Sequence, residues 1–258
     1  MKQLFGKAAC LIVLATCSVA SAQFVDENFD SYPIGNIDGL GPWVDFGGVN
    51  LTEVSSDYAH SGSHSMKMTL SDIVPNPDPN GTIGYGSDVF LDMPARVRSG
   101  QFMISYWTYL PGEFNGSNYA YFSEGLIGAG DFDLGTQIIT GSNAETVTLF
   151  DGGQSSSLPL IRDEWVETKQ IINFDTNSVR VTYGDDLLYE GKWDADQPSD
   201  GDFSQFRGVN FWVQDTFDAE APTGSMYIDD VKFVPEPNLT LAALLGVLSL
   251  ISSARRRS

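Results

Sequence analysis

Two groups of oxygen-bearing side chains flank the central region of this 258-residue sequence. Glu27, Asn28 and Asp30 lie near its start, whereas Asp229 and Asp230 lie in a largely apolar run near its end. Calcium takes six to eight hard oxygen ligands, which carboxylates and carbonyls supply. If the first and last strands of the fold are neighbours, these five residues are predicted to hold a structural calcium ion. The alternative is that the adjacent aspartates sit on a bulge and face water.

A second set of residues has the chemistry of a glycan-binding surface. In the segment 208–214, Asn210, Trp212 and Gln214 alternate with apolar residues and therefore share one face of a strand. An indole covers the C–H face of a sugar, and amides bind its hydroxyls. Trp107 and Tyr109 share a face of another segment, and the five could line one surface if the two strands are neighbours. The alternative is that both tryptophans belong to the core.

Short alternating segments separated by turn residues predict a fold built from strands. Asp175-Thr176-Asn177 joins two such segments and predicts a hairpin. No stretch of the central region sustains a helical period. We therefore predict an all-β antiparallel sandwich of jelly-roll type. The strand-like segments are 101–110, 119–127, 146–150, 165–174, 178–183, 208–214 and 225–234.

The N-terminal segment has the features of a secretory signal. Lys2 and Lys7 precede an apolar run over 8–15, and Ala20-Ser21-Ala22 supplies a small-residue cleavage site. We predict a signal peptide over 1–22. Both cysteines of the chain lie within it, so the region after it is predicted to hold together without disulfides.

The C-terminal segment combines Pro235-Glu236-Pro237, an apolar stretch over 239–254 and the cluster Arg255, Arg256 and Arg257. An apolar helix followed by arginines is typical of a membrane segment with a cytoplasmic positive stop. This order resembles the PEP-CTERM sorting signal over 235–258. The resemblance implies an exosortase-type processing enzyme as partner, export through the inner membrane, and placement in the cell envelope, on the outer surface or in the extracellular matrix.

Between the two ends lies a single predicted domain over 23–234 that is strongly acidic. Removing the five basic residues and one acidic residue of the ends leaves nine basic and 33 acidic residues, a formal charge of −24. Such a charge excludes nucleic acid and anionic lipid as partners of this region.

Several short motifs of this region resemble concanavalin A-like lectin/glucanase (laminin G-like) jelly rolls. They are 27–33, Gly41-Pro42-Trp43, 60–65, Glu164-Trp165-Val166 and 227–231. That fold carries lectins, hydrolases, lyases and passive modules. Its glucanases use a Glu-x-Asp-x-x-Glu strand, and the nearest segment here, 163–167, has a different spacing. Its lyases use a cationic neutraliser with a Tyr or His base, and the chain contains only His60 and His64.

The sequence therefore favours a non-enzymatic surface or matrix protein with weak calcium-aided binding of extracellular polysaccharide. Two alternatives stay open. One is a polysaccharide-degrading enzyme, either a glycoside hydrolase or a lyase, with an unrecognised active site. The other is a passive structural module with no ligand.

Overall fold

The computed structural model describes residues 25–45, 51–70, 86–123, 134–141, 145–151, 154–193, 205–214 and 224–235. The predicted signal peptide and almost all of the predicted sorting tail lie outside these ranges. Within them the secondary structure consists of strands and turns, and no helix there is long and apolar enough to cross a membrane.

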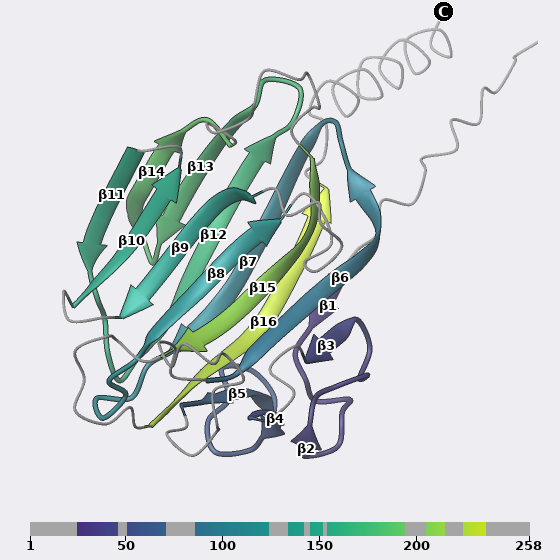
Figure 1. Ribbon diagram of the computed structural model, residues 1–258, viewed down its shortest axis with the longest axis vertical. Helices are drawn as coiled ribbons and strands as arrows, with labels where there is room; N and C mark the ends of the chain where they lie inside the picture. Colours follow the sequence, from purple (N-terminus) through teal and green to yellow (C-terminus); the bar gives the residue numbers. More distant parts are fainter. Residues whose placement is uncertain are drawn as a thin grey trace, which may run out of the picture.

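Two antiparallel sheets lie one on the other (Figure 1). The nine-stranded sheet has the order β14-β13-β12-β7-β16-β5-β4-β2, and β1 pairs with β16. Its strands are β1 (Val25–Glu27), β2 (Gly35–Asn36), β4 (Thr52–Ser55), β5 (Ser65–Thr69), β7 (Gln101–Tyr109), β12 (Trp165–Asn173), β13 (Ser178–Tyr183), β14 (Asp186–Gly191) and β16 (Ser225–Pro235).

The seven-stranded sheet has the order β11-β10-β9-β8-β15-β6-β3. Its strands are β3 (Trp43–Asp45), β6 (Asp88–Val97), β8 (Ser117–Ser123), β9 (Leu134–Gly141), β10 (Thr146–Asp151), β11 (Gln154–Pro159) and β15 (Phe206–Gln214). The predicted all-β jelly-roll sandwich is confirmed. The predicted hairpin is confirmed as well, because β12 pairs with β13 from Asn173↔Ser178 onward.

The core lies between the two sheets, and strands such as β12 bury every second side chain. In β7 the buried inner residues Phe102, Ile104 and Tyr106 alternate with the outer residues Met103, Ser105 and Trp107. The Tyr106 ring meets Phe211 of β15 edge-on, with centroids 5.1 Å apart. Tight aromatic packing of this kind holds the body together, and none of the described residues is a cysteine.

The first and last strands of the described body are neighbours, as the calcium prediction requires. Val25 pairs with Phe233 and Glu27 with Val231. The register of β16 against β7 shifts between Asp229 and Lys232, and Asp230 there has a φ of 48°. The two aspartates therefore sit on a β-bulge, but they are buried and do not face water.

Candidate active site on the seven-stranded sheet

Strand pairing places two rows of chemically active residues side by side on the outer face of the seven-stranded sheet. In the first row Asp88 of β6 lies opposite Trp212 of β15, which lies opposite Tyr119 of β8. In the second row Asn210 lies opposite Tyr121, which lies opposite Gln137 of β9. We call these six residues the aromatic face.

The rings of the aromatic face form a continuous, partly exposed surface. The Trp212 centroid lies 5.4 Å from that of Tyr119 and 6.4 Å from that of Tyr121. The two tyrosine rings are stacked with centroids 5.8 Å apart. All three residues are half-buried, because their neighbours along each strand point into the core. Such a surface can bind the C–H faces of successive sugar rings.

Asp88 is the acidic group beside this surface, and Asn210 fixes its orientation. The Asn210 Nδ2 donates to Asp88 Oδ1 at 2.6 Å and to the backbone carbonyl of Val89 at 3.1 Å. Because a carbonyl can only accept, the Asn210 amide nitrogen must face both groups. With Oδ1 engaged as an acceptor, a proton on Asp88 is left to Oδ2.

The surroundings of Asp88 favour its protonated form. Burial raises the pKa of Asp88 above its usual value, and the hydrogen bond from Asn210 only partly offsets that effect. The negative charge of Asp45, at the end of β3, raises the pKa further. Asp88 can therefore serve as a proton donor at a higher pH than an ordinary aspartate.

Tyr121 lies near Asp88 and keeps its proton. Burial raises its pKa to about 12, and the neighbouring Tyr119 and Asp88 contribute to the shift. At neutral pH the phenol is therefore a hydrogen-bond donor and a poor proton acceptor.

Arg207, one of the cations of this sheet, is paired with a carboxylate. Arg207 of β15 donates to Asp92 of β6 through Nε to Oδ1 at 2.8 Å and through Nη2 to Oδ2 at 3.2 Å. This two-point pairing holds the guanidinium against one carboxylate.

The five predicted glycan-binding residues do not form one surface. Asn210 and Trp212 belong to the aromatic face, and Gln214 lies further along β15 and is buried. Trp107 and Tyr109 lie on β7, which belongs to the other sheet, so they face the opposite side of the sandwich. The prediction of a shared surface is wrong for this reason. Both tryptophans are half-buried on outer faces, so neither belongs to the core.

Other rings cover the aromatic residues of the nine-stranded sheet. The His60 ring stacks on Trp107, with centroids 3.8 Å apart and planes at 14°. Tyr58 stacks on Tyr109 at 4.6 Å. The segment 58–60 therefore lies over these rings.

The predicted calcium ligands are engaged with other partners. Asp229 Oδ2 accepts from the backbone N–H groups of His60 and Ser61 at 2.8 and 3.1 Å, and Asp230 Oδ2 lies 2.7 Å from His60 Nδ1. Burial is the main cause that raises the pKa of Asp229 to about 6.

The other three predicted ligands lie near the first strand. Glu27 accepts from the Tyr32 hydroxyl at 2.7 Å, and Asp30 accepts from the backbone of Ser63 and His64. Asn28 Oδ1 accepts from the backbone N–H of Asp30 at 3.3 Å. Among the described ranges no group of three or more His, Cys, Asp or Glu side chains could hold a metal ion. The calcium site stays a prediction.

Four members of the aromatic face were not predicted from the sequence: Asp88, Tyr119, Tyr121 and Gln137. In β8, Tyr119 and Tyr121 alternate with buried residues. In β6, Asp88 comes directly before the buried apolar residues Val89 and Leu91. The alternation in β8 was a usable signal. The pairing of β6, β8 and β15, which brings them together, spans more than 100 residues of chain and left no local trace.

Comparisons with known proteins confirm the fold. No family model and no curated protein matches the sequence. Solved structures do match. A GH131 β-glucanase catalytic domain from Podospora anserina is 13% identical, with a TM-score of 0.52 over 81% of this chain and 93% of that chain. An alginate lyase in complex with alginate tetrasaccharide is 11% identical, with a TM-score of 0.53 over 83% of this chain and 97% of that chain.

A sialidase also matches, at 10% identity and with a TM-score of 0.57. The match covers 83% of this chain but only 18% of the length of the sialidase. At these identities the likeness establishes a shared jelly-roll-like sandwich and assigns no role to any residue. The prediction of a non-enzymatic module is nevertheless contradicted, because catalytic domains that act on polysaccharides are among the matching structures. The alternative of a polysaccharide-degrading enzyme has the better support.

Proposed function

We propose that this protein is an exported polysaccharide-degrading enzyme of the glycoside hydrolase type. The observation that carries the proposal is Asp88, an aspartate with a raised pKa that Asn210 orients beside a platform of one tryptophan and two tyrosines. The similar folds of a β-glucanase and an alginate lyase support an activity on glycans.

In the proposed reaction Asp88 acts as the general acid. A sugar ring rests on Trp212, and Asp88 Oδ2 donates its proton to the glycosidic oxygen as the bond to the anomeric carbon breaks. Water attacks that carbon, and its proton passes to the surrounding solvent. The products are two shorter chains, one of which has a new reducing end.

Three features favour hydrolysis of a neutral glycan over lyase chemistry on a uronate. A lyase needs a cation to neutralise the substrate carboxylate and a base to remove a carbon-bound proton. Arg207 is paired with Asp92, and Tyr121 has a pKa of about 12. The charge of −24 over 23–234 also repels polyuronates.

The experiment is an assay of reducing-end release from neutral β-glucans. We expect Asp88→Asn to lose turnover while it retains substrate binding, because the amide keeps the shape of the side chain but donates no proton. Asp26→Asn, the same change at an exposed position of β1, is the matched control and should retain full activity. Equal activity in both variants would refute the assignment. Release of an unsaturated uronate from alginate would replace the hydrolase with a lyase.

The proposed location of the protein is the cell envelope or the extracellular matrix. The signal-like segment 1–22 and the PEP-CTERM-like segment 235–258 support it. Extracellular fractionation with mass spectrometry of the mature ends is the test, and full-length chain in the cytosol would contradict the proposal.

A further inference from the structure

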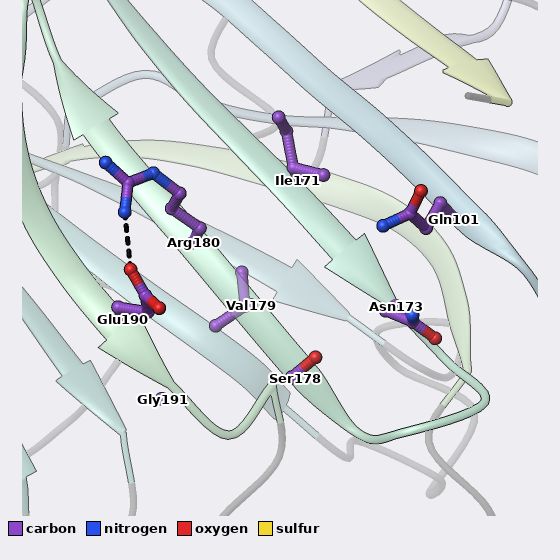
Figure 2. A pocket seen from close by; sticks show the side chains of 8 residues that line it. All are labelled: Gln101, Ile171, Asn173, Ser178, Val179, Arg180, Glu190 and Gly191. Carbon is purple, nitrogen blue, oxygen red and sulfur yellow. Dashed lines mark hydrogen bonds and ion pairs between the residues drawn. The ribbon is translucent and has the colours of Figure 1, made fainter. Parts of the chain in front are cut away.

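The outer face of the nine-stranded sheet contains a hollow of about 490 Å³ at the end of the sheet formed by β7, β12, β13 and β14. It lies on the opposite side of the sandwich from the aromatic face, because β7 and β12 belong to the other sheet. Figure 2 shows side chains from these four strands around it. Its volume lies within the range of about 300–1,000 Å³ that is common for small-molecule sites.

Strand register arranges the lining in two rows. Gln101 lies opposite Asn173, which lies opposite Ser178. In the next row Ile171 lies opposite Arg180, which lies opposite Glu190. An amide-rich row therefore runs beside a row that combines an aliphatic side chain with an ion pair.

The amides of this hollow are available as donors and acceptors. Asn173 Oδ1 accepts from the backbone N–H groups of Asp175 and Thr176 in the hairpin turn, at 3.0 and 3.2 Å. The turn thus fixes the Asn173 side chain and leaves its amide nitrogen to donate elsewhere. Gln101 is exposed, and no hydrogen bond joins its side chain to another of the described residues.

The charges of the hollow are internally compensated. Arg180 Nη1 donates to Glu190 Oε2, as the dashed line in Figure 2 shows. The pair offers further donors and acceptors without a net charge. Ile171, in the same row as the ion pair, supplies an apolar patch. Two amides, a neutral ion pair and an aliphatic floor suit an uncharged ligand with several hydroxyl groups, which is the chemistry of a sugar ring.

From this geometry we propose that the hollow is a second, non-catalytic binding site for neutral glycan. It would hold a short stretch of polysaccharide on the side of the sandwich away from Asp88. Binding of the same polymer at two sites raises the effective concentration of substrate at the aromatic face. The role in catalysis rests on the proposed function, whereas the binding itself does not.

The experiment titrates the full chain, made inactive by Asp88→Asn, with laminarihexaose and cellohexaose in a calorimeter. We expect two glycan molecules per chain. Adding Gln101→Ala and Arg180→Ala should remove one of them, with at least a tenfold loss of affinity at that site. Gln154→Ala, at an exposed glutamine of β11, is the control and should change nothing. Equal melting temperatures of the variants show that the fold is retained.

The outcomes separate this proposal from the proposed function. A single bound glycan that the two substitutions remove supports the hollow and removes the glycan-binding role of the aromatic face. If the two substitutions leave the stoichiometry and the affinity unchanged, the proposed site in the hollow is wrong. It is also wrong if an alginate hexasaccharide binds and the two neutral hexasaccharides do not. In active protein we expect Gln101→Ala/Arg180→Ala to raise KM on polymer several-fold with kcat unchanged on a short oligosaccharide.

Discussion

The two outer faces of the sandwich contain similar residues in different states. On the seven-stranded sheet Trp212, Tyr119 and Tyr121 form a partly exposed surface beside an aspartate whose pKa is raised. On the nine-stranded sheet Trp107 and Tyr109 lie beneath His60 and Tyr58. Residue type alone therefore does not define a glycan site. The neighbours that cover a ring or leave it accessible decide its role.

The largest expected effect is a difference in kcat between substitutions on the two outer faces of the sandwich. Asp88→Asn should lower kcat by about 100- to 10,000-fold, the usual contribution of a general acid. Glu167→Gln, a carboxylate of β12 paired with Lys169, should leave kcat within about twofold because that pair faces the other side. Steady-state kinetics on a soluble neutral glucan provide the measurement. A comparable loss in both variants would erase the distinction between the faces.

Substitution of Trp107 should reduce mainly the stability of the fold, whereas substitution of Trp212 should reduce mainly glycan binding. Trp107→Ala removes the ring beneath His60 and should lower the free energy of unfolding by about 2 kcal/mol, somewhat less than a fully buried tryptophan. Trp212→Ala should weaken glycan binding about tenfold, or about 1.4 kcal/mol, with little unfolding. Urea titration and calorimetry measure the two quantities. Collapse of the Trp212→Ala fold would make that ring structural.

The pH dependence of turnover should carry the signature of Asp88. A general acid works only while it is protonated, so kcat/KM should fall as the pH rises through the pKa of Asp88, which lies above the usual aspartate value. Asn210→Ala removes a hydrogen bond to the charged form and should shift this limb to higher pH. The check is a pH–rate profile of the unsubstituted protein and of the Asn210→Ala variant. An unshifted limb would show that Asn210 does not influence the pKa of Asp88.

The smallest effect is expected at His60. His60→Ala removes the stack on Trp107 and the contact with Asp230, and we expect a loss of about 1–2 kcal/mol in the free energy of unfolding. Activity should stay unchanged. A thermal melt and a glucan assay on the same sample suffice. A loss of turnover at equal stability would place chemistry on the nine-stranded sheet.

The sequence predicted the fold well because strand patterns are local. The alternation in β12 follows from burial of every second residue, and the Asp175-Thr176-Asn177 turn marks its own hairpin. The condition attached to the calcium prediction, that the first and last strands are neighbours, is met by β1 and β16.

The site was predicted only in part, because it depends on pairings between distant segments. Asn210 and Trp212 share a strand and were found together, but their partner Asp88 lies 122 residues from Asn210 along the chain. The sequence likewise gave no sign that β7 and β15 lie in different sheets. The contact between His60 and Asp230, 170 residues apart, was missed for the same reason.

The pairing of Val25 with Phe233 means that the two ends of the described body lie side by side. A short peptide could therefore join Pro235 to Val25, and new termini could be opened at the exposed Thr176 turn between β12 and β13. Such a circular permutant should keep both sheets, because no strand pairing depends on the order in which the segments are translated.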